Sequence, residues 1–174
     1  MDASWPLRTS PLRFFDLETT GLRPDRGARI TEAAVMDHRD LQLYWHCDHG
    51  SSIARMVPQL ISVLTETVVV GHNLAFDFRF LTYEAERQKH PPFTLRYIDT
   101  LALARRLDLH NQLPDLALQT LAEHMMDPET IGAITFHTAQ GDARATRAVL
   151  WSLAEQHALH SLSEAGLQRF SWTM

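Results

Sequence analysis

The sequence predicts an α/β fold in which helices cover a mixed sheet. Strand-like patterns come first, at residues 12–17, 29–36 and 41–47, and later strands alternate with helices. The chain has 174 residues, which suffice for one domain with a sizeable core. Its composition, 45% hydrophobic and 21% charged, is ordinary for a globular protein. We therefore expect a single domain over residues 1–174.

Three strands and a helix are expected in the first part of the chain. Residues 12–17 are expected to form the first strand. A Thr-Thr-Gly turn follows at residues 19–21, and a polar loop over residues 22–27 leads to residues 29–36. In residues 41–47, leucine and tryptophan alternate with Gln, Tyr and His at the period of two of a strand. Residues 53–65 have apolar side chains at helical spacing, although Pro58 lies near the start.

Two short strands and four helices are expected in the rest of the chain. Three consecutive valines at residues 68–70 are typical of a strand that is buried on both faces. A fifth strand at residues 97–98 leads into Asp99 and Thr100, a plausible helix N-cap pair. The expected helices are residues 75–88, 101–107, 116–125 and 141–156.

The remaining segments are expected to be irregular. Residues 127–136 have no clear period. Residues 1–11 are predicted to be a loose lead-in, and residues 160–174 a tail in which residues 162–174 add a short helical turn. The sequence has no repeat and no linker, which favours one domain.

Composition limits the possible classes of protein. Cys47 is the only cysteine, which excludes an intrachain disulfide and a four-cysteine zinc site. No apolar run approaches the ~20 residues that span a bilayer, and no secretory signal is visible. We expect a cytoplasmic protein without a membrane partner. The formal charge of -5 is unlike that of proteins that hold long nucleic acids by their backbone, but it permits an enzyme whose site supplies its own cations.

The first chemical cluster ends the first strand. Asp16 and Glu18 lie two residues apart, so a strand places both carboxylates on one face and buries Phe15 and Leu17 on the other. The two negative charges repel each other, and a bound cation would offset this repulsion. Hard divalent cations prefer such oxygen ligands. A solvated strand end that enters a turn is the alternative.

The second cluster lies where the valine strand gives way to a helix. His72 and Asn73 follow the strand, and Asp77 falls in the first turn of the helix. Open α/β sheets bind ligands beyond the carboxyl ends of their strands. Asp77 is therefore a candidate cation ligand, although capping the helix dipole is the more common role for this segment alone.

The third cluster pairs His137 with Asp142. Five residues correspond to about 140° on a continuous helix, so the two side chains need not share a helix face. If His137 lies in a loop and Asp142 in the following helix, both can point into one site. The chain has 10 histidines, so His137 is singled out only by this spacing and by the other carboxylates.

Together the clusters predict metal-dependent chemistry. Four carboxylates without a cysteine ligand favour Mg²⁺ or Mn²⁺ over zinc. Two such ions ~4 Å apart catalyse in-line displacement at phosphorus. A neighbouring histidine can accept the proton of the attacking water near neutral pH.

The order of the three motifs resembles the DEDDh class of DnaQ-like 3′→5′ exonucleases. The motifs are Asp-x-Glu-Thr-Thr-Gly, His-Asn-x-x-Phe-Asp and His-x-x-x-x-Asp, and the resemblance covers residues 12–153. The exonuclease domain of the DNA polymerase III epsilon subunit is a member of this class. The resemblance implies a ribonuclease H-like, mixed five-stranded sheet flanked by helices. It also implies two Mg²⁺ or Mn²⁺ ions and single-stranded DNA or RNA 3′ ends as substrates.

The resemblance implies a role for each motif residue. Asp16 would bridge both ions. Glu18 and Asp142 would complete the coordination shell of the nucleophile-side ion, and Asp77 would hold the second ion. His137 would be the general base. The residues expected to bind the terminal nucleotide are Thr19, Thr20, Gly21, Leu22, Asn73 and Phe76.

The resemblance also bears on positions outside the ligand set. Leu22 would wedge against the terminal base, and Asp99 is expected to cap a helix or support the ligands rather than bind metal. Residues 49–52 are all that corresponds to a His-Gly-Ile-Thr stretch of the relatives, which leaves a substrate role for His49 open. Thr135 and Phe136 stand where many relatives have basic residues or histidine.

The predicted activity is the metal-dependent release of nucleoside 5′-monophosphates from 3′ ends. The enzyme would act alone or as a proofreading subunit held by a DNA polymerase. A non-catalytic nucleic-acid-binding module is the alternative from another class. A phosphatase of the haloacid dehalogenase type, whose Asp-x-Asp-x-Thr loop residues 16–20 loosely resemble, would leave the pairing of His137 with Asp142 unexplained.

Overall fold

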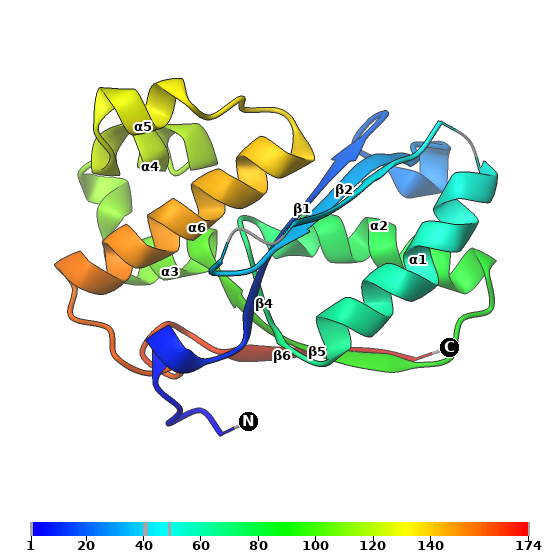
Figure 1. The fold of residues 1–174 in the computed structure, drawn as a ribbon, viewed down its shortest axis with the longest axis horizontal. Helices are drawn as coiled ribbons and strands as arrows, with labels where there is room; N and C mark the ends of the chain where they lie inside the picture. Colours follow the sequence, from blue (N-terminus) through cyan, green and yellow to red (C-terminus); the bar gives the residue numbers. More distant parts are fainter. Residues whose placement is uncertain (1, 40–41, 49, 174) are drawn as a thin grey trace.

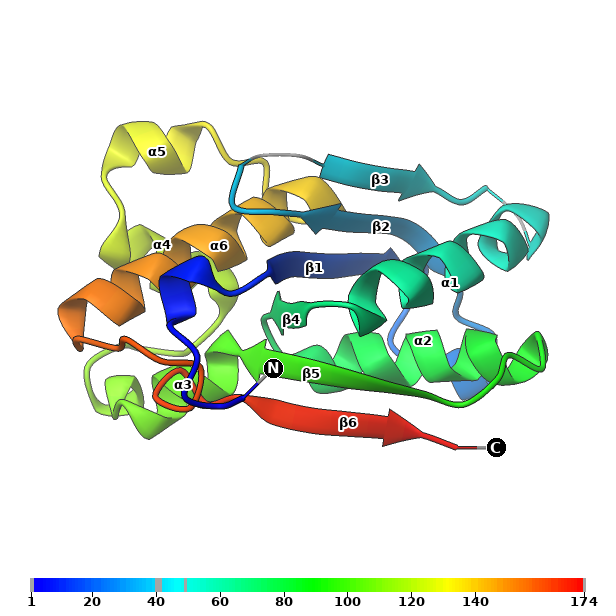
Figure 2. The same ribbon diagram turned by 60° about the horizontal axis from the view of Figure 1, so that its bottom comes forward.

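One mixed sheet organises the chain. The computed structural model describes residues 2–39, 42–48 and 50–173. The six strands of these residues lie side by side in the order β3-β2-β1-β4-β5-β6 (Figure 2). Their bounds are β1 (Leu12–Thr19), β2 (Ile30–Met36), β3 (Gln42–His46), β4 (Val68–Gly71), β5 (Phe93–Asp99) and β6 (Gln168–Trp172). The pairs β1–β4 and β4–β5 are parallel and the other pairs are antiparallel.

Helices cover both faces of the sheet (Figure 1). One face packs against α1 (Gly50–Thr65) and α2 (Leu74–Arg87). The other face packs against α3 (Thr100–Arg106), α4 (Leu118–Met125) and α6 (Ala139–Gln156), and α5 (Pro128–Gly132) lies against α4.

The side-chain alternation of β1 divides the core into two clusters. Phe15 and Leu17 pack with α1 and α2, whereas Leu12 and Phe14 pack with α6 on the opposite face. Because side chains alternate along a strand, Asp16 must point to the same face as Phe14. The acidic end of β1 therefore continues the face that α6 covers.

The α/β class and the mixed sheet are confirmed, but the sheet has a sixth strand. The prediction of a helical turn over residues 162–174 holds only for the first part, where the N–H of Ala165 donates to the Ser161 carbonyl at 3.1 Å, because β6 pairs antiparallel with β5 from residue 168 on. Aromatic packing explains this strand: the ring of Phe170 stacks on Phe78 at 4.7 Å, and the ring of Trp172 lies 5.4 Å from that of Phe93. These partners are far away in sequence, so a five-residue segment with two apolar side chains gave little local signal.

Three further segments differ from expectation. The fifth strand, expected at residues 97–98, extends over β5. Within residues 127–136, expected to be irregular, Asp127 caps the short helix α5. The lead-in is not loose, because Leu7 is fully buried and its N–H donates to the carbonyl of His160 at 2.8 Å.

Two expectations fall outside the described residues. Leu41, expected to begin the third strand, and His49, whose substrate role was left open, both lie there. Among the described residues, no helix is long and apolar enough to cross a membrane.

Candidate active site

The carboxyl-terminal half of β1 is open along the edge that faces β4. β4 pairs with β1 only at Leu12, Arg13 and Phe14, whereas β2 pairs with β1 as far as Thr19. Asp16 and Glu18 therefore lie beyond the last pair with β4. The early end of β4 leaves room there for another element.

The turn between β4 and α2 fills that room. Gly71 ends β4, and a Cβ at this position would overlap the Leu74 side chain, so glycine permits the close exit from the sheet. Asn73 adopts the left-handed conformation, with φ of 61°. Its N–H donates to Asp99 Oδ1 at 2.9 Å, and the N–H of Leu74 donates to Asp99 Oδ2 at 3.0 Å.

Asp99 therefore has the capping role that was favoured for it. Its carboxylate also accepts hydrogen bonds from the N–H groups of Leu101 at 2.9 Å and Ala102 at 3.5 Å, at the start of α3. One side chain thus satisfies N–H groups at the starts of two helices. This fixes the first turn of α2, which carries Asp77.

Asp77 joins α2 to β1. Its side chain is 3% exposed, and its Oδ1 accepts a hydrogen bond from the N–H of Leu17 at 3.0 Å. Leu17 lies between Asp16 and Glu18 in the chain. The Asp77 carboxylate is therefore held beside Asp16 and Glu18 by the backbone N–H of the residue between them.

The start of α6 supplies Asp142 and His137. Thr138 caps this helix, because its Oγ1 accepts from the N–H of Gly141 at 3.1 Å. His137 lies in the preceding loop, with φ of 60°, and its N–H donates to Asp142 Oδ1 at 3.3 Å. A Cβ at Gly141 would overlap the Thr135 carbonyl, so this glycine lets the loop fold back onto the first turn.

The resulting cluster has the geometry of a cation site. Asp16, Glu18 and Asp142 each present a carboxylate oxygen within 4.8 Å of the others. Asp16 Oδ2 is buried and has no hydrogen-bond partner among the described residues. A buried carboxylate oxygen without a partner is costly unless it binds a cation. The oxygen donors therefore fit a hard divalent ion such as Mg²⁺ or Mn²⁺.

The pKa shifts of the clustered carboxylates also favour a bound cation. Burial, and then the charges of Asp77 and Asp142, raise the pKa of Asp16 well above its ordinary value. Burial raises the pKa of Asp77 equally clearly, against two backbone N–H donors. Burial also raises the pKa values of Glu18 and Asp142, and the His137 charge lowers both. Together these groups favour protonation unless positive charge is present.

Glu32 is a fifth carboxylate of this region, which the motif analysis missed. It lies on β2 directly opposite Glu18, and its Oε2 accepts from the N–H of Ala139 at 3.4 Å. Its charge raises the pKa values of Asp16 and Glu18. The available signal was an acidic residue in a mostly apolar strand, but only the pairing of β1 with β2 brings it to the site.

The predicted nucleotide-binding residues fall into two groups. Thr19 ends β1, and Thr20, Gly21 and Leu22 form the turn after it, where Thr19 Oγ1 donates to the Gly21 carbonyl at 2.8 Å. Leu22 is 74% exposed, the highest value among the exposed large apolar side chains of the described residues. Asn73 and Phe76 lie at the start of α2, and the Phe76 ring packs on that of Phe80 at 5.0 Å.

Comparison with known proteins places most of the chain in one family. The family described as the RNase H superfamily matches residues 13–149. The chain is 32% identical over 108 residues to a PolC-type DNA polymerase III of Thermotoga maritima, which is 62% of this chain and 7% of that one. It is 25% identical over 169 residues to that of Streptococcus pneumoniae serotype 2, which is 92% of this chain and 10% of that one.

A third relative is a putative bifunctional exonuclease/endonuclease protein of Mycobacterium tuberculosis. The identity is 30% over 108 residues, which is 62% of this chain and 16% of the relative. The chain thus spans only a small part of each of these proteins.

A solved structure supports the same fold. A family B DNA polymerase from Pyrobaculum calidifontis superposes with a TM-score of 0.55 at 16% identity, over 86% of this chain and 24% of that one. At this identity the likeness concerns the fold alone. The family match over residues 13–149 agrees with the mixed sheet, and the chain belongs to the RNase H superfamily.

Proposed function

We propose that this protein is a metal-dependent 3′→5′ exonuclease of the DEDDh type. It removes nucleoside 5′-monophosphates from the 3′ ends of single-stranded DNA or RNA. The observation that carries the proposal is the meeting of Asp16, Glu18 and Asp142 within 4.8 Å, with a buried Asp16 oxygen that has no partner among the described residues.

Each element of the site has a role in this proposal. Asp16, Glu18, Asp77 and Asp142 would hold two divalent ions, which would supply activation of a water and stabilisation of the leaving oxygen. His137 is exposed and lies in a loop, outside the helices and strands. Its imidazole therefore has the freedom to accept the proton of the water. The hydrogen bond from its N–H to Asp142 keeps this base beside a ligand.

The terminal nucleotide is bound by the turn after β1 and the start of α2. The backbone of Thr19, Thr20 and Gly21 contacts the nucleotide, and the exposed Leu22 meets its base. Asn73 and Phe76 shape the opposite side of the pocket. Because these contacts use the base and the backbone rather than a cationic surface, they suit short single strands better than long duplexes.

The test is nucleotide release from single strands labelled at the 3′ or 5′ end, DNA and RNA in parallel. We expect stepwise loss from the 3′ end in Mg²⁺ or Mn²⁺ and none in EDTA. His137→Ala should slow release by at least about 100-fold. His157→Ala, at the end of α6, is the matched control and should behave as wild type. If the folded protein binds single strands but releases nothing with either metal, it is a binding module instead.

A DNA polymerase partner is a second part of the proposal. It rests on the relatives, several of which are named DNA polymerase III PolC-type. Tagged protein should then retain a polymerase through a salt wash, and the complex should release mismatched 3′ ends faster than the isolated chain. If no polymerase is retained, the enzyme acts alone.

A further inference from the structure

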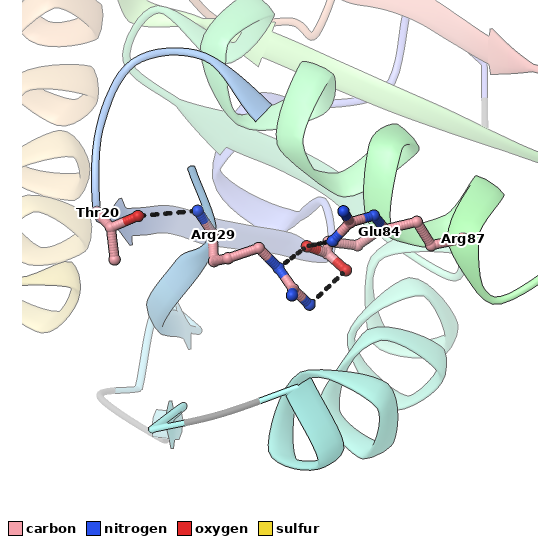
Figure 3. A network of polar contacts seen from close by, with 4 residues as sticks. All are labelled: Thr20, Arg29, Glu84 and Arg87. Carbon is pink, nitrogen blue, oxygen red and sulfur yellow. Dashed lines mark hydrogen bonds and ion pairs between the residues drawn. The ribbon is translucent and has the colours of Figure 1, made fainter. Parts of the chain in front are cut away.

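The loop between β1 and β2 is closed at its base by two residues. Thr20 donates its N–H to the Arg29 carbonyl at 2.9 Å. In the other direction, the N–H of Arg29 donates to Thr20 Oγ1 at 3.0 Å, the bond drawn in Figure 3. Residues 20–29, the β1–β2 loop, therefore form a closed unit. The turn that carries Leu22 moves with this unit.

An ion pair between the half-buried Arg29 and the buried Glu84 attaches the base of the loop to α2. Arg29 Nε and Nη2 donate to the two carboxylate oxygens of Glu84 at 2.7 and 3.2 Å (Figure 3). Glu84 is 2% exposed, and Arg87 Nη1 lies 3.9 Å from its Oε1. A bidentate pair fixes orientation as well as distance. The end of the β1–β2 loop is therefore held in one orientation against the helix.

A second contact attaches the beginning of the loop to the same helix. Arg79 Nη2 donates to the Leu22 carbonyl at 3.1 Å, while its guanidinium lies over the Phe76 ring at 5.5 Å. The backbone of Leu22 is thus held although its side chain is 74% exposed. An exposed leucine side chain contributes little to the folded core, so folding does not require its backbone to be held. Holding the backbone is useful if the side chain must meet a ligand in a defined position.

The same helix also reaches the carboxylate cluster. Asp77 of α2 accepts from the N–H of Leu17, within the strand that carries the other ligands. α2 therefore contacts the metal-binding end of β1 and both ends of the β1–β2 loop. It sets the position of Leu22 relative to the carboxylates.

We propose that Arg29, Glu84 and Arg79 are positioning residues that fix Leu22 for the base of the 3′-terminal nucleotide. This inference rests on the proposed function. The three residues need not touch the substrate. They act through the loop, so they should govern affinity for the terminal nucleotide and leave the chemical step alone.

The test uses two oligonucleotides that differ only in the terminal base. One ends in a normal nucleotide and the other in an abasic residue, which offers nothing for Leu22 to contact. Three variants are compared with wild type: Leu22→Ala, Arg79→Met, and the double variant Arg29→Met with Glu84→Met. The double variant removes both charges together, because loss of Arg29 alone would leave the buried carboxylate with only the longer contact to Arg87 and risk unfolding.

We expect each variant to raise KM for the normal strand about tenfold, with kcat nearly unchanged. The abasic strand should show the higher KM already with wild type, and the variants should not raise it further. Arg79→Met combined with Leu22→Ala should lose no more than Leu22→Ala, since both act on one contact. Arg79→Lys, which can still donate to the Leu22 carbonyl, should restore part of the affinity.

Other results would overturn the inference. If wild type releases nucleotides but the variants keep its KM, or lose affinity equally for both strands, the loop contacts do not position Leu22. If wild type releases nothing with Mg²⁺ or Mn²⁺, the proposed exonuclease function fails, and the same variants are compared by binding of the two labelled strands in Ca²⁺. Tighter binding of the normal strand that the variants abolish would uphold the positioning role, and equal binding of both strands would refute it.

Discussion

The N–H of Leu17 donates to Asp77 Oδ1 at 3.0 Å across 60 residues of sequence. This bond joins the strand that carries Asp16 and Glu18 to the helix that replaces β4 beside it. Asp77 therefore has two functions that can be separated by mutation. It accepts a structural hydrogen bond, and it is a candidate metal ligand.

We predict that Asp77→Asn keeps the fold and loses activity. The amide oxygen can still accept from Leu17, while the charge needed for a cation is removed. Asp77→Ala should cost about 1–3 kcal/mol in the free energy of unfolding, because it leaves a buried N–H without a partner. Both variants should reduce nucleotide release by at least about 100-fold. Thermal melts and release assays check this, and an active Asp77→Asn would remove Asp77 from the ligand set.

The metal-free protein should lose stability as the pH rises. The pKa values of Asp16, Glu18, Asp77 and Asp142 are raised in the folded state, chiefly by burial. Between the unfolded values of about 4 and the raised folded values, the folded state binds more protons, so the free energy of unfolding falls with increasing pH.

A divalent ion should reverse this trend, because it favours the ionised carboxylates. The increase in Tm caused by Mg²⁺ should therefore be larger at about pH 8 than at about pH 5. Melting curves with Mg²⁺ or EDTA across this range provide the measurement. An Mg²⁺ effect that is absent, or larger at low pH, would contradict a carboxylate cation site.

Glu32 should support the start of α6. Its Oε2 accepts from the N–H of Ala139, three residues before Asp142. Glu32→Ala should weaken Mn²⁺ binding by about tenfold, because the helix start is less well held. Glu32→Gln keeps an acceptor and should bind Mn²⁺ nearly as wild type does. Calorimetric titration compares the three proteins, and unchanged binding by Glu32→Ala would show that the contact is dispensable.

Gly141→Ala should disrupt the His137 loop. The added Cβ would overlap the Thr135 carbonyl, and the backbone must shift to relieve the overlap. We expect a loss of about 1–3 kcal/mol in the free energy of unfolding and a large loss of activity. Gly132→Ala is the matched control, because its Cβ would have no neighbour within 4 Å. Equal stability of the two variants would contradict the predicted overlap.

Local patterns predicted most of the elements because their causes are local. The three valines of β4 and the apolar spacing of α6 each specify an element without reference to the rest of the chain. β6 was missed because its stability comes from Phe78 and Phe93, which lie in other elements. The short helix α5 was missed because it spans only five residues, although Asp127 is a recognisable cap.

Part of the candidate site also follows from local sequence, and part follows only from the fold. The sequence alone determined the identity and order of the carboxylates, because the period of two along β1 places Asp16 and Glu18 on one face. It also placed His137 before the helix that carries Asp142. Only the tertiary structure joined Glu32 to Ala139 and Arg29 to Glu84, which are 107 and 55 residues apart. Such contacts depend on which elements become neighbours in the fold, and no local period of the sequence encodes that.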